Sequence, residues 1–282
     1  MKKIFIINLF ILFTLVSCNN KEIDNRSDNE KKLPLNDYFT NNIKFKDETN
    51  EDDFNSFIDS SSNSNTLFSV EMHQGVKLEI YSKTTNDDNE EVIFDYSESN
   101  YYDYAFKIDD DSKLYAYIDN VSRIVDKSSN SSGDTSNGTF SEFLKSNNGY
   151  IQKSYTDNKL VTTKIKDDDI TSYKSEFQNY INTLYEKNAY NDEFINSFNS
   201  TTYYKIDENN YGLKGKVSFT YEQIIFDCDA YIVFNKLGYI KDLIYEGVYD
   251  STESSSTYDM HAKFKLVQNL NFNEEIKYKL NL

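Results

Sequence analysis

The 282-residue sequence has no tryptophan, one proline, two histidines and two cysteines. Zinc sites use the imidazole nitrogens of histidine and the thiolate sulfurs of cysteine, and both residues are scarce here. Neither an HxxxH nor a CxxC spacing occurs. The sequence also lacks the G-x-S-x-G, P-loop and GxGxxG patterns. Because no catalytic or cofactor motif is recognisable, we predict a protein that is not an enzyme and binds no cofactor.

The two histidines, His73 and His261, both lie in segments with the alternation of β-strands. Two such residues could meet across a sheet and supply two metal ligands, but zinc sites usually have three or four. We therefore predict that neither histidine belongs to a metal site.

Basic residues are also scarce, because 30 lysines and arginines face 47 acidic residues and give a net charge of −17. Such a surface repels nucleic acid and disfavours it as a partner. Acidic runs at residues 87–91, 109–111 and 167–169 contain oxygen ligands that Ca²⁺ prefers, but none has the spacing of an EF-hand loop. We interpret the first two as solvated turns and the third as the start of a helix.

A short apolar run follows the basic residues Lys2 and Lys3, with the sequence IFIINLFILFTLV over residues 4–16. In a helix it would span about 20 Å at roughly 1.5 Å per residue. A bilayer core about 30 Å thick needs a longer transmembrane helix. The run therefore has the length of a secretory signal peptide.

The segment Leu15-Val16-Ser17-Cys18 resembles the lipobox of bacterial lipoproteins. The resemblance implies that the Cys18 thiol receives a diacylglyceryl group, that cleavage follows Ser17, and that fatty acids such as palmitate hold the mature chain. Two or three acyl chains give stable attachment, whereas one binds only marginally. We therefore predict an extracytoplasmic protein, with a lipid attached at Cys18, on a membrane of the cell envelope.

Three regions are expected: a signal peptide over 1–17, a lipidated, polar and flexible tether over 18–50, and a single α+β globular domain over 51–282. If Cys18 carries lipid, Cys228 has no disulfide partner. Alternation places Phe226, Cys228 and Ala230 on one apolar face, which predicts a buried, inert thiol.

Apolar spacing predicts helices over 51–60, 168–187 and 192–199, and another after the loop at 127–138, around Phe140 and Phe143. Period-two alternation predicts one set of strands at 67–73, 76–83, 91–97, 101–108 and 113–120, with another at 150–155. A second set is predicted at 201–207, 213–223, 224–234, 239–249, 257–267 and 274–280. Because the connections are short, each set is expected to form an antiparallel meander. The predicted class is α+β, with a curved antiparallel sheet packed on a few central helices.

This element order resembles the half-barrel of periplasmic lipoprotein carriers such as the LolA-like and LppX-like families. The segment AYIVFNKLGYIKDLIYEGVY, residues 230–249, resembles the late hairpin of those proteins. The resemblance implies a cavity for a lipid or another apolar ligand. Two hypotheses lead: a non-enzymatic lipoprotein that binds a protein or glycan at the envelope, and, as the alternative, a carrier or chaperone of a hydrophobic ligand. A third, a hydrolase with unrecognised carboxylates, requires two or more acids that converge in a cleft with perturbed pKa values. Abundant tyrosine is compatible with a recognition surface, but strand packing explains it more simply.

Overall fold

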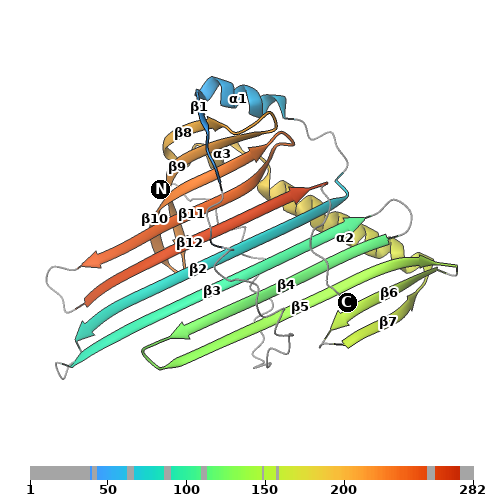
Figure 1. Ribbon diagram of the computed structural model, residues 1–282, viewed down its shortest axis with the longest axis horizontal. Helices are drawn as coiled ribbons and strands as arrows, with labels where there is room; N and C mark the ends of the chain where they lie inside the picture. Colours follow the sequence, from blue (N-terminus) through green and yellow to red (C-terminus); the bar gives the residue numbers. More distant parts are fainter. Residues whose placement is uncertain are drawn as a thin grey trace.

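The computed structural model describes residues 39, 43–61, 67–85, 90–108, 113–147, 149–156, 159–252 and 258–273. Figure 1 shows one broad antiparallel sheet accompanied by a few helices. The strand order is β1-β8-β9-β10-β11-β12-β2-β3-β4-β5-β6-β7. The predicted leader, Cys18 and most of the predicted tether lie outside the described residues.

Two meanders make up the sheet, as the alternation predicts. The first contains β2 (Ser69–Thr85), β3 (Glu91–Ile108), β4 (Lys113–Asp126), β5 (Ser131–Ser146), β6 (Gly149–Thr156) and β7 (Lys159–Ile165). The second contains β8 (Asn199–Lys205), β9 (Asn210–Tyr221), β10 (Ile224–Asn235), β11 (Tyr239–Thr252) and β12 (Tyr258–Phe272). Antiparallel pairing of β12 with β2 joins them into one sheet.

The helices lie on one face of this sheet, which we call the helix face. They are α1 (Glu51–Ser60), α2 (Asp167–Asn188) and α3 (Asp192–Ile195). In Figure 1, α2 lies behind the strands. It packs on the sheet through Phe177, whose ring centroid is 5.6 Å from that of Phe106 on β3 and 6.0 Å from that of Phe143 on β5.

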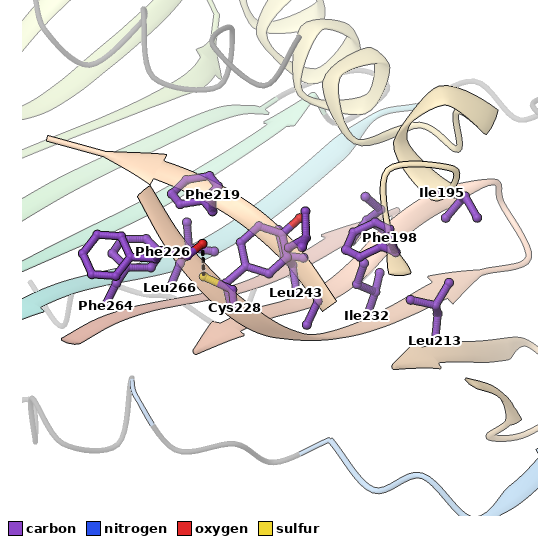
Figure 2. Packing of buried hydrophobic residues seen from close by; sticks show 14 of the residues in the cluster. Ile195, Phe198, Leu213, Phe219, Phe226, Cys228, Ile232, Leu243, Phe264 and Leu266 are labelled. Atoms are coloured by element: carbon purple, nitrogen blue, oxygen red, sulfur yellow. Dashed lines mark hydrogen bonds between the residues drawn. The ribbon is translucent and has the colours of Figure 1, made fainter. Parts of the chain in front are cut away.

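Two clusters of buried apolar side chains cover the helix face. The α2 cluster contains Ile181 and Phe177 together with Val70, Met72, Leu270 and Phe272 of the sheet. The α1 cluster contains Phe54 and Ile58 of α1 together with strand residues such as Leu78, Cys228 and Phe264. Figure 2 shows part of the α1 cluster, in which Phe219, Phe226 and Phe264 gather at one end.

A chain of buried amides lies on the helix face between these clusters. Gln74 donates to Gln268 at 3.4 Å, Gln268 donates to Asn188 of α2 at 2.8 Å, and Asn188 donates to the carbonyl of Leu184 at 2.8 Å. Buried polar groups are costly unless they are hydrogen-bonded, so this chain fixes how α2 sits on β2 and β12.

The antiparallel sheet of two meanders and the helices over 51–60, 168–187 and 192–199 are confirmed in their essentials. The sheet dominates the molecule more than a balanced α+β class implies. It is also open and uncurled, so the prediction of a curved sheet was wrong. The loop at 127–138 and the helix around Phe140 were wrong, because residues 131–146 form β5 and pair continuously with β4. A serine- and glycine-rich sequence has little strand propensity, but the ladder of β4 supplies its hydrogen bonds.

Part of the predicted tether belongs to the sheet. Residues Asp47–Thr49 form β1, which pairs with β8 from Asp47↔Lys205 to Thr49↔Tyr203. The structured region therefore begins before the predicted boundary at residue 51, because three residues of polar sequence gain backbone partners along an open sheet edge.

Candidate functional site

A row of polar residues crosses the face of the sheet opposite the helices. Asp242 of β11 lies across from Asn269 of β12, Asn269 across from His73 of β2, and His73 across from Asp103 of β3. Asn269 donates a hydrogen bond of 2.5 Å to Asp242. Residues in register across an antiparallel sheet share a face. The four strands therefore bring together side chains as far apart in the sequence as His73 and Asn269, which sequence spacing alone does not connect.

His73 is at the centre of this row, between two buried carboxylates. Its Nδ1 is 2.6 Å from Oδ1 of Asp103, and its Nε2 is 3.6 Å from Oε1 of Glu71. Asp103 is only 3 % exposed and Glu71 only 5 %. We call His73, Asp103 and Glu71 the histidine cluster.

Electrostatics keep this histidine charged. Burial by itself lowers the pKa of His73, but the hydrogen bonds and charges of Asp103 and Glu71 outweigh burial and raise the pKa to about 9. His73 is therefore protonated at neutral pH and cannot act there as a general base. Its charge instead compensates two buried carboxylates, that of Glu71 on its own strand and that of Asp103 on β3.

The pKa of nearby Asp242 is also raised, which for a carboxyl group favours the neutral form. Burial raises the pKa of its carboxyl group, while the hydrogen bond from Asn269 and the charge of Lys241 lower it in part. Within the described ranges, no group of three histidine, cysteine, aspartate or glutamate residues is placed to hold a metal ion. Side-chain hydrogen bonds in the row join β11 to β12 through Asp242 and Asn269, and β2 to β3 through His73 and Asp103.

The second histidine lies far from the first. His261 of β12 pairs with Tyr81 of β2, whereas His73 pairs with Asn269, eight residues further along β12. Eight residues span about 27 Å at 3.3–3.4 Å per residue. The idea that the two histidines meet across the sheet is therefore wrong, since the register separates them. His261 instead lies at the surface beside Asp250 at 2.5 Å and Asp259 at 3.1 Å.

A segment leading into β1 forms a second feature of the opposite face, and we call residues 43–46 the strap. The ring of Phe45 lies over Gly212 of β9, so that a Cβ atom at Gly212 would stand 2.2 Å from Phe45 Cε1. Its ring centroid is 4.7 Å from that of Tyr204 and 6.3 Å from that of Tyr231. Only glycine leaves room for this approach.

A lysine contacts the same aromatic rings as the strap. Lys214 Nζ lies 4.9 Å from the ring centroids of both Phe45 and Tyr204 and 5.9 Å from that of Tyr231. Such cation–π contacts are worth about 0.5–1 kcal/mol at exposed sites and more when desolvated. Phe39 makes an analogous contact further across the sheet, 5.3 Å from Tyr101 and against Gly75. The chain that leads from Cys18 is therefore fixed to this face at two aromatic contacts.

The other residues singled out in the sequence lie outside the polar row and the strap. Cys228 is 1 % exposed, and burial raises the pKa of its thiol to about 12, in agreement with the predicted inert thiol. Asp167 begins α2, as predicted for the acidic run there. Residues 109–111 and most of 87–91 lie outside the described part of the chain, as does the lipid site Cys18. Of the clustered tyrosines, Tyr101 and Tyr115 are buried in the sheet.

Comparisons with known proteins give little further guidance. No family model matches the chain, and a search of curated proteins found no match. Among solved structures, the chain is similar to a DUF1329 family protein from Desulfovibrio piger at 10 % identity, covering 80 % of this chain and 92 % of that protein. The TM-score of 0.14 is low. Among the described helices, none combines the length and apolar character needed to cross a bilayer.

Proposed function

We propose that the chain is a lipid-anchored extracytoplasmic protein of the cell envelope that binds another macromolecule without catalysing a reaction. The observation that carries this proposal is the Leu15-Val16-Ser17-Cys18 segment behind a short apolar leader. Acyl chains on Cys18 would hold the domain at a membrane through the segment that ends in the strap.

The geometry of the opposite face supports binding rather than chemistry. The half-buried His73 is held protonated between carboxylates, so it serves neither as a base nor as a neutral metal ligand. Large apolar side chains on strands remain open to solvent, among them Ile225 at 60 % and Val248 at 56 % exposure. These residues lie close together on β10 and β11, because Val248 is opposite Asp227, two positions from Ile225. Exposed apolar groups of this kind are typical of contact surfaces.

The alternative is a half-barrel carrier of an apolar ligand, which needs space between α2 and the sheet. Side chains fill that interface: the ring centroids of Phe143 and Tyr173 are 4.6 Å apart, and those of Phe106 and Tyr180 are 5.0 Å apart. Ile181 is fully buried there. This packing favours a binding domain with a closely packed interior over a carrier with an apolar cavity.

Metabolic labelling with an alkyne-bearing palmitate analogue, in a bacterium that expresses the full chain, tests the anchor. We expect label on the wild type, none on Cys18→Ser, and loss of that variant from the membrane fraction. Cys228→Ser is the matched control, because it removes the other cysteine and should keep both label and location. Equal label on the wild type and Cys18→Ser, or an intact leader in the mature mass, would contradict the proposal.

The same purified material separates the two functions. Native mass spectrometry of the detergent-extracted domain should show the covalent anchor and no further lipid in stoichiometric amount. A reproducible non-covalent lipid adduct on the wild type would favour the carrier.

A further inference from the structure

Strand β7 is the last strand at one end of the sheet in the part of the chain that the structure describes. It pairs with β6 from Tyr150↔Ile165 to Thr156↔Lys159 without a register shift, and it is last in the strand order. Every second residue of an edge strand directs its N–H and C=O away from the sheet. Among the described residues, β7 therefore offers a straight row of backbone groups for another strand.

Natural proteins usually protect such edges by shortness, proline, bulges, a covering segment or charged side chains, especially lysine. The opposite edge follows this rule, because β1 has three residues. β7 has seven residues and no proline, and all residues from Leu160 to Lys164 are exposed. Leu160 is 51 % exposed on one face and Val161 48 % exposed on the other. A strand added here would therefore gain apolar contacts on both faces as well as a backbone ladder.

The charge of this edge is opposite to that of the molecule. Residues 149–166 contain four lysines and one aspartate, in a chain whose net charge is −17. The nearest acidic residues in the sequence and the sheet are Asp167, which begins α2, and Glu142 of β5, which lies across from Lys153. Lys153 of β6 and Lys164 of β7 share a face as diagonal neighbours, because Lys153 pairs with Thr162 and Ile151 with Lys164. In the part of the chain that the structure describes, neither they nor Lys166 form an ion pair, whereas Lys77, Lys216 and Lys265 do.

We infer that β7 is a strand-addition site for an extended acidic segment of a partner protein. A second copy of β7 is disfavoured as the occupant, because the lysines of two such edge strands would repel one another. Acidic side chains on an incoming strand would instead lie across from Lys164 and near Lys153. This inference rests on the proposed binding function and names the kind of partner that it takes.

A fluorescein-labelled peptide with alternating glutamates, Glu-Val-Glu-Thr-Glu-Val-Glu, is the probe, and the detergent-solubilised full chain is the protein. We expect saturable binding by fluorescence anisotropy. The charge reversal Lys153→Glu with Lys164→Glu should weaken it at least tenfold, because both lysines would then repel the peptide. Lys236→Glu with Lys263→Glu is the matched control: it changes the net charge equally at exposed sites elsewhere, and it should change the affinity less than twofold.

Hydrogen exchange then tests whether the peptide adds as a strand. We expect the amides of residues 159–165 to exchange more slowly when the peptide is bound, with no comparable change elsewhere. No saturable binding by the wild type, equal binding by the charge-reversed variant, or protection confined to another element would each overturn the inference.

A membrane surface is the competing partner for a basic edge, and reconstitution distinguishes it. The anchored chain is placed in vesicles of phosphatidylcholine with or without phosphatidylglycerol, and we expect the same exchange at β7 in both. Slower exchange with the anionic lipid, without peptide binding, would overturn strand addition. Failure of acylation at Cys18 would leave the peptide measurement intact, so the two proposals fail separately.

Discussion

At the scale of single residues, the histidine cluster explains how carboxylates are tolerated inside a sheet face. Asp103 and Glu71 are almost fully buried, and each would be costly without a positive partner. His73 supplies that charge to both carboxylates. It lies on the same strand as Glu71, and the strand of Asp103 is its neighbour in the sheet. An imidazole that is mostly neutral at pH 7 in water thereby carries a positive charge at neutral pH in the folded protein.

This arrangement predicts a pH-dependent stability. A histidine pKa raised from 6.5 to about 9 stabilises the folded state by on the order of 3 kcal/mol. Because the folded pKa is the higher one, this contribution is fully present below pH 6.5 and is lost as the pH rises through 9. Urea unfolding of the wild type should therefore give a free energy of unfolding that falls between these pH values.

The variant His73→Gln should be less stable than the wild type at pH 6 and should lose most of this slope. His261→Gln is the control, because His261 also lies between two aspartates but at the surface, where solvent screens the charges. A wild-type slope that survives in His73→Gln would assign the titration to another group.

At the scale of elements, sequence periodicity predicted what depends on local pattern. The face formed by Phe226, Cys228 and Ala230 is buried as alternation requires, and α2 occupies the segment whose apolar residues recur at helical spacing. The predicted strands at 67–73 and 76–83 are one strand, β2, because Gly75 continues the ladder instead of ending it. A glycine within a strand segment suggests that the strand ends there. Hydrogen bonds to two neighbouring strands can nevertheless keep the backbone extended.

Features that depend on register were beyond sequence reasoning. Nothing near His73 in the sequence indicates Asp103, since the pairing of β2 with β3 alone brings them together. The strap was missed for the same reason: Phe45 lies in a polar segment, and its partners Tyr204 and Tyr231 come from β8 and β10. The contact has one local signal, Gly212, but a lone glycine does not specify which ring it admits.

The strap contact predicts a local change in protease sensitivity. Replacing Phe45 by alanine removes its contacts with Tyr204, Tyr231 and Lys214, so the strap should detach more often while the sheet stays folded. Loss of roughly 1–2 kcal/mol of aromatic contact corresponds to about a five- to thirty-fold larger detached population. Limited trypsin digestion should therefore cleave after Lys44 or Lys46 faster by a similar factor.

Phe94→Ala controls for a general loss of stability, because Phe94 is a 40 % exposed aromatic on β3, away from the strap. Its digestion at Lys44 and Lys46 should match the wild type. If Phe45→Ala and Phe94→Ala are cleaved alike, the strap is not held by its aromatic contacts.

At the scale of the whole molecule, the two apolar clusters share their long strands. β2 contributes Val70 and Met72 to the α2 cluster but Val76 and Leu78 to the α1 cluster. β12 is divided in the same way, with Leu270 in one cluster and Leu266 in the other. Unfolding one cluster would remove the backbone partners of the other, so the sheet should behave as a single cooperative unit despite its two cores.

The absence of tryptophan allows a clean test of this cooperativity. Tyr173→Trp places a reporter beside Phe143 in the α2 cluster, and Tyr203→Trp places one beside Phe54 in the α1 cluster. In each variant, the urea midpoint of tryptophan fluorescence should coincide with the midpoint of far-ultraviolet circular dichroism. The fluorescence reports on one cluster and the dichroism on the sheet, so the two signals compare a part with the whole of the same molecule. A fluorescence transition in either variant that precedes the dichroism change would show that its cluster unfolds alone, and that the shared strands couple the halves less tightly than their continuous ladder implies.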